Sequence, residues 1–309
     1  MRITIMGTGG VGGYFGGRLA QAGVDVRFIA RGAHLAALQS EGLRLISPQG
    51  DLHLPKVQAS ADPATFGPCD VVMFGVKLWD TETAARALLP VVSAETAVIS
   101  FQNGVVKEEM LRSVLGKAPV VPGVAYVSAT IDAPGVIRHV GTLAKLAFGE
   151  SDGSVSPRLQ ALAEVCTAAG VDHVLSTDIQ RALWEKFVFL SSVSAATAAA
   201  RLPVGRLRAD PSARAVLLAL FEEAAAVARA EGVALPADFA QKRLGIVDSL
   251  PEGMKASMAH DLERGNRLEV PWLSADVVAR GLRLGVPTPT HAALAGVLAP
   301  HAQGGRPLS

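Results

Sequence analysis

Cysteine is scarce in this chain, which has two cysteines, Cys69 and Cys166, among 309 residues. Two cysteines form neither a disulfide framework nor a metal site of the usual cysteine-rich kind. We therefore expect no bound metal. Both thiols are expected to be buried, apolar side chains in a reducing compartment.

The chain also lacks an excess of charge of one sign and a long apolar run. Its 29 basic and 28 acidic residues give a formal net charge of +1, and no long run of one sign occurs. This balance gives no indication of a nucleic-acid partner. Lys186 and Arg201 bracket the longest apolar stretch, which excludes a membrane span there. The first predicted strand begins at once, leaving no room for a signal peptide. We expect a soluble, cytoplasmic protein.

The pattern of predicted elements changes near residue 177. Before it, strands alternate with helices: a strand over 70–77 precedes a helix over 81–89, and residues 120–148 contain several strands, partly antiparallel. After it, prolines separate successive helical segments and no convincing strand occurs. The pattern predicts an α/β domain with a mostly parallel, doubly wound sheet over residues 1–176. An all-α domain follows over residues 177–309.

Seven glycines lie between positions 7 and 17, directly after a short apolar strand over 2–6. The six residues after that strand fit G-x-G-x-x-G: Gly7, Thr8, Gly9, Gly10, Val11 and Gly12. A helical pattern and a second strand over 24–30 follow. This strand–turn–helix–strand arrangement is typical of a dinucleotide-binding site, in which backbone N–H groups approach the pyrophosphate. A glycine-rich turn without a ligand is the alternative.

An arginine follows the second predicted strand, where an NAD site has an acidic residue for the ribose hydroxyls. The corner contains Ile29, Ala30 and Arg31 and no carboxylate. A guanidinium at this corner can bind a 2′-phosphate. The pattern therefore favours NADP over NAD, and a solvated loop arginine is the alternative.

Two polar residues follow later strands of the predicted sheet. Lys77 ends the strand "DVVMFGVK", and Asn103 follows "TAVISF". Because the carboxyl ends of parallel strands form the ligand crevice of such a sheet, both side chains are placed to contact the cofactor or the substrate. A surface lysine and an ordinary Asn-Gly turn are equally consistent with the sequence.

Lys186 lies within a strongly apolar helical stretch. Such a lysine either extends along the helix to reach solvent or lies in a cleft, where it can donate a proton to a carbonyl oxygen. Further along, Ser257 and Asp261 have helical spacing, and Glu269 follows. A carboxylate there can bind a substrate hydroxyl or orient Lys186. The alternative is a helix end with solvated charges.

Taken together, these residues resemble the ketopantoate reductase family, the NADPH-dependent 2-dehydropantoate 2-reductases. The landmarks span nearly the whole chain: the loop over 7–12, "GVK" at 75–77, "QNG" at 102–104, "WEK" at 184–186, Ser257, Met258, Asp261, Glu269 and "GVPTP" at 285–289. The resemblance implies a Rossmann-type N-terminal domain, a helical C-terminal domain and hydride transfer from NADPH to a 2-oxo acid. It also implies that Lys186 is catalytic with Glu269 as its acidic partner, that Lys77 and Asn103 line the junction of cofactor and substrate, and that Ser257 contacts the substrate.

The chain departs from the family pattern at positions expected to contact the substrate. Members of the family typically have asparagines four and eight residues after the catalytic lysine, where this chain has Leu190 and Ser194. Pro271 and Ser274 replace a common acid and a common asparagine. The sequence therefore predicts an intact hydride-transfer apparatus with an altered substrate-binding face that includes Leu190 and Ser194.

Three classes of function remain open from the sequence. The first is an NADPH-dependent reductase of 2-oxo acids, with ketopantoate as the leading substrate. The second is a related reductase of a less polar 2-oxo acid or ketone. The third is a non-catalytic NADP-binding sensor, against which the presence of both Lys186 and Glu269 argues. The oligomeric state is open, with a homodimer as one expectation.

Overall fold

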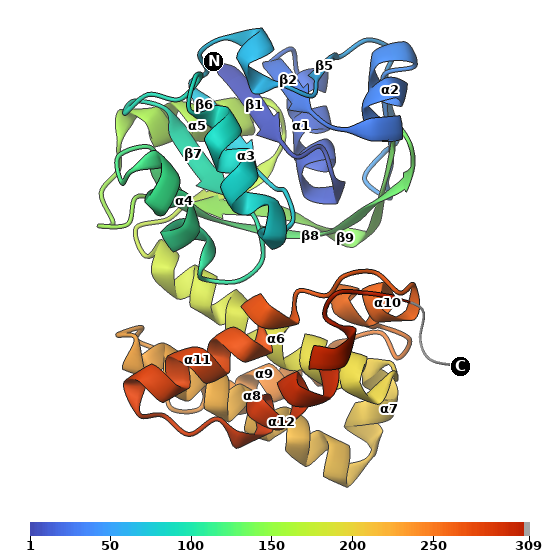
Figure 1. Ribbon diagram of the computed structural model, residues 1–309, viewed down its shortest axis with the longest axis vertical. Helices are drawn as coiled ribbons and strands as arrows, with labels where there is room; N and C mark the ends of the chain where they lie inside the picture. The colour runs from blue at the N-terminus through green and yellow to red at the C-terminus, as the bar shows by residue number, and fades with distance from the viewer. Residues whose placement is uncertain (306–309) are drawn as a thin grey trace. The chain divides into compact units, whose positions relative to one another are not determined.

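Residues 1–305 are described by the computed structural model, and they divide into two units (Figure 1). Unit 1 comprises Met1–Asn103 and Lys107–Ala182. Unit 2 comprises Gly104–Val106 and the chain from Leu183 onward. The domain boundary predicted at residue 176 stays a prediction.

Unit 1 is built on one ten-stranded sheet. Its strands are β1 (Arg2–Met6), β2 (Asp25–Ile29), β3 (Leu43–Ile46), β4 (Leu52–Leu54), β5 (Gln58–Ser60), β6 (Val71–Phe74), β7 (Ala97–Ser100), β8 (Val120–Ala133), β9 (Val136–Phe148) and β10 (Asp172–Leu175). Their order in the sheet is β4-β3-β9-β8-β7-β6-β1-β2-β5, with β10 paired to β9.

The parallel part of the sheet has the strand order of a dinucleotide-binding fold. The run β5-β2-β1-β6-β7-β8 is parallel throughout. Numbered along the chain, these strands have the order 3-2-1-4-5-6 of the doubly wound Rossmann sheet. The direction of winding reverses between β1 and β6, which makes the edge beyond their carboxyl ends the expected ligand crevice. The predicted fold class of unit 1 is confirmed.

Two layers of apolar side chains cover the two faces of this sheet. Alternate residues of β1 and β6 point to opposite sides: Ile3 and Ile5 belong to one buried cluster, and Val72 and Phe74 to another. The helices of unit 1 are α1 (Gly10–Gln21), α2 (Gly32–Ser40), α3 (Thr81–Leu88), α4 (Lys107–Leu115) and α5 (Pro157–Ala168). Short 3₁₀ helices span Pro63–Phe66 and Leu78–Asp80. Burial on both faces explains the continuous apolar runs of the central strands.

The region 120–148 differs from the prediction of several strands. It forms two long strands, β8 and β9 (Figure 1). They pair antiparallel, with register shifts near Val127 and Ile131. The shifts bend the pair without ending it. Side chains of β9 and β3 pack on α1, where a Cβ on Gly13 would lie 2.7 Å from Ile137 and one on Gly17 would lie 3.0 Å from Leu45. The glycines of α1 therefore permit close packing of this helix.

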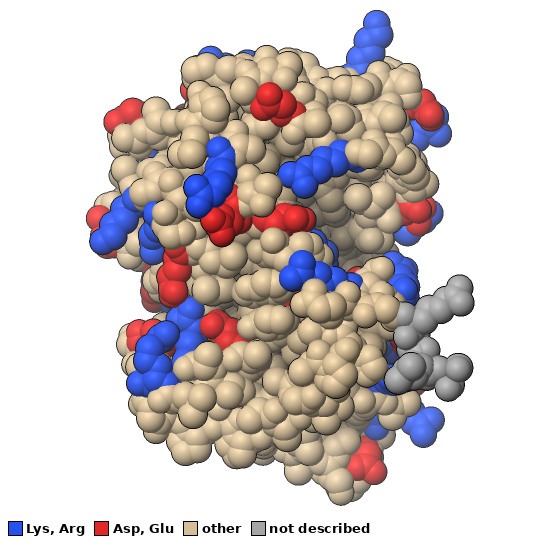
Figure 2. All heavy atoms as spheres, in the orientation of Figure 1, with Lys and Arg blue, Asp and Glu red and all other residues tan. Residues whose placement is uncertain are grey.

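Unit 2 is helical among its described residues, as predicted. Its helices are α6 (Ile179–Ala200, with Leu183–Ala200 in this unit), α7 (Val204–Ala209), α8 (Pro211–Ala230), α9 (Phe239–Ser249), α10 (Ser257–Glu263), α11 (Ser274–Leu284) and α12 (Pro289–Leu298). Short 3₁₀ helices span Val270–Trp272 and Ala299–His301. Within residues 1–305, no helix is long and apolar enough to cross a membrane. Basic and acidic side chains are interspersed on the face drawn in Figure 2.

Candidate cofactor and active-site residues

The turns that follow β1, β2, β6 and β7 lie together at one edge of the sheet, because these strands are parallel neighbours. We call this the carboxyl edge, comprising residues 7–12, 30–31, 75–77 and 101–103. Backbone hydrogen bonds continue the sheet into it: Gly75 N donates to Met6 O at 2.9 Å, and Phe101 N donates to Phe74 O at 2.9 Å. The predicted candidates Lys77 and Asn103 both lie at this edge.

The glycine loop is shaped by close contacts that exclude side chains. Gly7 has φ of +99°, and a Cβ there would lie 2.8 Å from the backbone nitrogen of Val76. A Cβ on Gly10 would overlap the Ala129 carbonyl oxygen, and one on Gly12 would overlap the Gly7 carbonyl oxygen. The first and third glycines of the pattern therefore serve the tight turn and the close packing of helix on strand.

The second glycine of the pattern has a different environment. A Cβ on Gly9 would meet no protein atom within 4 Å, although Gly9 is the N-cap of α1. The space beside Gly9 is therefore open where the first N–H groups of α1 are exposed. The first turn of α1 contains no acidic residue. A helix N-terminus of this kind fits an anionic pyrophosphate.

Thr8 fixes the loop to the end of β2, beside the predicted specificity residue. Its backbone N and its Oγ1 both donate to Ile29 O, each at 3.0 Å. Arg31 follows two residues later as the N-cap of α2 and is exposed. Val11 is half-buried and packs against the core of unit 1. A guanidinium at the end of β2 fits the 2′-phosphate of NADP.

The turns after β6 and β7 are joined by the side chain of Gln102, which the sequence reasoning did not single out. Its Nε2 donates to Val76 O at 2.9 Å and to Thr81 Oγ1 at 2.8 Å, and its Oε1 accepts from Ser100 Oγ at 3.1 Å. Lys77 is exposed, with its Nζ 5.5 Å from the centre of the Trp79 ring. Gln102 thereby fixes the backbone on which Lys77 and Asn103 lie.

In unit 2, α6 contains three predicted residues at intervals of four, which is the spacing of one helix face. Lys186 is half-buried among buried neighbours that include Trp184 and Phe187. Leu190 is half-buried and packs against the apolar core of unit 2. Ser194 is fully buried. Their catalytic and substrate-binding roles stay predictions.

The buried hydroxyls of α6 differ in their hydrogen bonds. Ser191, Ser192 and Thr197 donate to the carbonyl oxygens four residues earlier, at 2.8, 2.8 and 2.7 Å. Ser194 Oγ is buried without a hydrogen-bond partner among the described residues, as is the Oγ of Ser274, which begins α11. An unsatisfied buried hydroxyl has a free-energy cost of about 1–3 kcal/mol.

The remaining predicted residues of unit 2 differ in exposure. Glu269 is buried, 6% exposed, at the N-cap of the 3₁₀ helix Val270–Trp272. Ser257 is exposed as the first residue of α10. Asp261 accepts a hydrogen bond from Asn266 Nδ2 at 3.1 Å. The expected helical spacing of Ser257 and Asp261 is confirmed, and Glu269 is the more buried of the two carboxylates.

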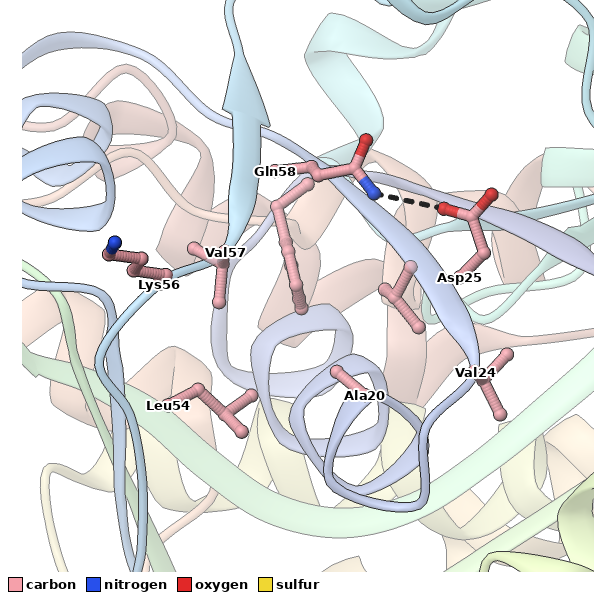
Figure 3. Close-up of a pocket in the computed structure, with 9 residues that line it drawn as sticks. Ala20, Val24, Asp25, Leu54, Lys56, Val57 and Gln58 are labelled. Atoms are coloured by element: carbon pink, nitrogen blue, oxygen red, sulfur yellow. Dashed lines mark hydrogen bonds between the residues drawn. The ribbon is translucent and has the colours of Figure 1, made fainter.

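A pocket of about 180 Å³ in unit 1 lies away from the carboxyl edge. Its lining includes Asp25, at the start of β2, together with Lys56 and Gln58 (Figure 3). Gln58 Nε2 donates to Asp25 Oδ1 at 3.1 Å (Figure 3). Because Arg31 follows the other end of β2, this pocket is separate from the proposed cofactor contacts. No cluster of three potential metal ligands occurs within residues 1–305.

Comparison with known proteins agrees with this arrangement. Residues 3–153 match the family model described as "Ketopantoate reductase PanE/ApbA", and residues 178–302 match the model of its C-terminal domain. The chain belongs to the ketopantoate reductase family. It is an oxidoreductase of the kind that acts on CH–OH groups.

Individual known proteins are similar to this chain over nearly their full length. A 2-dehydropantoate 2-reductase of Mesorhizobium japonicum is 32% identical, with 94% of each chain covered. The uncharacterized oxidoreductase YkpB of Bacillus subtilis is 28% identical, covering 94% of this chain and 95% of the relative. The crystal structure of a PanE/ApbA family ketopantoate reductase from Ralstonia eutropha superposes with a TM-score of 0.89 at 38% identity, covering 98% of each chain.

Proposed function

We propose that this protein reduces a 2-oxo acid to a 2-hydroxy acid with NADPH, and that 2-dehydropantoate is the leading substrate. The glycine loop at the carboxyl edge is the observation that carries the proposal, because Gly9 leaves the start of α1 open to a pyrophosphate. The named activity of the Mesorhizobium relative supports the choice of reaction.

The residues of the carboxyl edge fit a dinucleotide. The loop over 7–12 would hold the pyrophosphate, Arg31 would bind the 2′-phosphate, and Lys77 and Asn103 would contact the nicotinamide end or the substrate. A nicotinamide cofactor bound there supplies the hydride for carbonyl reduction. Arg31 and the absence of a carboxylate beside it support NADPH over NADH.

Lys186 is the proposed proton donor. As hydride reaches the carbonyl carbon, the two electrons of the C=O π bond move to oxygen, and the Lys186 ammonium gives that oxygen a proton. The lysine then recovers its proton from solvent. Glu269 is proposed as its acidic partner, and Ser257 is proposed to contact the substrate.

A second candidate is a reductase of a less polar 2-oxo acid or ketone. Leu190 and Ser194 favour it, because an apolar side chain and a short hydroxyl replace two amides that can hydrogen-bond a substrate. Under either candidate, the assembly proposed for the protein is a homodimer and the proposed location is the cytoplasm.

Oxidation of NADPH in the presence of a panel of 2-oxo acids and ketones tests the proposal. The panel includes ketopantoate and bulkier, less polar 2-oxo acids. Product analysis should find one 2-hydroxy acid formed for each NADPH consumed. If none of the compounds in the panel supports the oxidation of NADPH, the proposed function is contradicted.

A further inference from the structure

Lys107, the first residue of α4, is an unusual buried lysine. Its side chain is 1% exposed, although lysine is almost never fully buried without a partner. It lies four residues before Leu111, a buried side chain on the same helix face. The proposed function does not assign a role to Lys107.

The Lys107 ammonium is hydrogen-bonded to three backbone carbonyls. Nζ donates to Ser100 O at 2.9 Å, to Gln102 O at 2.9 Å and to Gly123 O at 2.6 Å. Three acceptors require three N–H donors, which only the protonated amine has. A neutral amine would direct its lone pair at one of these oxygens. The geometry therefore requires a charged lysine.

Glu108 provides the opposite charge nearby. Its Oε1 lies 3.7 Å from Lys107 Nζ, and its side chain is also buried. Burial lowers the pKa of Lys107 and raises the pKa of Glu108, and each partner's charge opposes the shift of the other. The three carbonyls account for the position of the ammonium, whereas Glu108 Oε1 has no hydrogen-bond partner among the described residues and interacts with the ammonium through opposite charge.

These hydrogen bonds converge on the turn that contains Asn103. The Gln102 carbonyl that Lys107 binds belongs to the peptide group linking Gln102 to Asn103. The side chain of the same Gln102 is bound to Val76 O and Thr81 Oγ1. The orientation of that peptide is thus set from the main chain by Lys107 and from the side chain by Gln102.

We propose that Lys107 is a positioning residue for Asn103 in the reduction. It holds the Gln102–Asn103 peptide in the orientation that directs Asn103 at the carboxyl edge, and it acts on the reaction only through that residue. The inference rests on the proposed function, in which Asn103 contacts the cofactor or the substrate.

A double-mutant cycle between Lys107→Met and Asn103→Ala tests this role. The measurements are kcat/KM for the best 2-oxo acid of the panel at saturating NADPH, and Tm in the same buffer. We expect Lys107→Met to lower kcat/KM by about ten-fold in the native background and by less than about two-fold in the Asn103→Ala background. Its effect on Tm should be the same in both backgrounds. Lys117→Met, which changes an exposed lysine of unit 1, should leave kcat/KM unchanged.

Equal losses of kcat/KM in both backgrounds would overturn the proposal, because Lys107 would then act independently of Asn103. If Lys107→Met does not fold, the double variant Lys107→Met, Glu108→Gln takes its place, because it removes both buried charges. The reference protein is then Glu108→Gln, and both proteins are measured with and without Asn103→Ala. Failure of both variants to fold would also overturn it, since the lysine would then serve the fold alone. The Asn103→Ala variant distinguishes failure of the proposed function from failure of the role proposed for Lys107. Full activity of Asn103→Ala would contradict the role of Asn103 in the proposed function.

Discussion

The carboxyl edge of unit 1 and the buried hydroxyls of unit 2 differ in how their polar groups are satisfied. The Gln102 amide at the edge and the Lys107 ammonium at the start of α4 donate to named acceptors, and Gln102 belongs to the "QNG" landmark. In unit 2, Ser194 and Ser274 have buried hydroxyls without partners among the described residues. Both serines replace asparagines common in the family.

The Gln102 and Lys107 side chains are therefore held in fixed positions, whereas two buried hydroxyls of unit 2 are unsatisfied. At the edge, the side chain of Gln102 is hydrogen-bonded at both its amide nitrogen and its amide oxygen. The hydroxyls of Ser194 and Ser274 have no hydrogen-bond partner within residues 1–305. These unsatisfied hydroxyls are consistent with the second candidate function, a reductase of a less polar substrate.

Replacing Lys186 should have the largest effect. Lys186→Ala should lower kcat by about 10²–10⁴-fold, because the proton donor to the carbonyl oxygen is lost, and should leave the Kd for NADPH nearly unchanged. Steady-state kinetics and calorimetric titration measure the two quantities. Lys242→Ala is the matched control, since Lys242 is an exposed lysine of unit 2 paired with Asp238 at 3.0 Å. Near-native turnover of Lys186→Ala would mean that Lys186 has no catalytic role.

His291 should make the stability of unit 2 depend on pH. Burial lowers the pKa of His291 to about 4 from an unfolded value of 6.5, so the unfolded chain binds a proton at a higher pH than the native one. The neutral His291 therefore contributes about 3 kcal/mol to the free energy of unfolding above pH 6.5, and this contribution is lost as the pH falls from 6.5 toward 4.

Urea unfolding between pH 7 and pH 4 measures this contribution. His291→Gln keeps a donor for Leu220 O, which His291 Nε2 approaches at 3.0 Å, and should flatten the loss of stability on acidification. His53→Gln, at an exposed histidine of unit 1, should retain the native pH dependence. An unchanged acid profile in His291→Gln would show that other groups control it.

Removing the guanidinium at the end of β2 should reduce the preference for NADPH. Native protein should bind NADPH more tightly than NADH, and Arg31→Ala should lower that preference by about ten-fold or more, since a charge-assisted phosphate contact is worth about 1.5–3 kcal/mol. Calorimetric titration of both cofactors gives the ratio, and Arg44→Ala, at an exposed arginine on β3, serves as the control. Equal binding of the two cofactors to native protein would exclude the proposed role of Arg31.

Introducing asparagine at positions 190 and 194 of unit 2, where the family typically has it, should have the smallest effect. Leu190→Asn, Ser194→Asn should raise kcat/KM for ketopantoate by about ten-fold, because one recovered hydrogen bond contributes about 0.5–1.5 kcal/mol. The value for a bulkier, apolar 2-oxo acid should not rise. High native efficiency with ketopantoate, with no gain in the double variant, would show that other residues supply the contacts.

The first βαβ unit could be predicted from sequence because its signals are local. The glycine spacing and the apolar runs on either side specify β1, α1 and β2 within a residue or two at each end. Strands β3, β4 and β5, and helix α2, were not predicted. Three of these elements have three or four residues each and depend on pairing with distant strands, as β3 does with β9. Local periodicity does not detect such pairing.

The candidate site was predicted only in part, for a similar reason. Asn103 and Lys77 lie at the carboxyl edge as predicted, although β6 ends at Phe74 and not at Lys77. Lys107 and the hydrogen bonds of Gln102 were not predicted, because their partners are distant in sequence, such as Gly123 O and Val76 O. One signal was present: Lys107 lies four residues before Leu111, on the buried face of a short helix. The four-residue interval between Lys107 and Leu111 did not show whether this face of α4 is buried or exposed to solvent.

Titration of NADPH into the Gly9→Ala and native proteins tests the central claim most directly. A methyl group added at Gly9 would meet no protein atom within 4 Å, so Tm should not fall. The same methyl group would lie where the pyrophosphate of NADPH is proposed to approach the N-terminus of α1, so binding should weaken. Gly245→Ala, on α9 with similarly open space, is the control and should bind NADPH as the native protein does. The account predicts tight binding by native protein and at least about ten-fold weaker binding by Gly9→Ala at unchanged Tm. Equal affinity of the native and Gly9→Ala proteins for NADPH would contradict it.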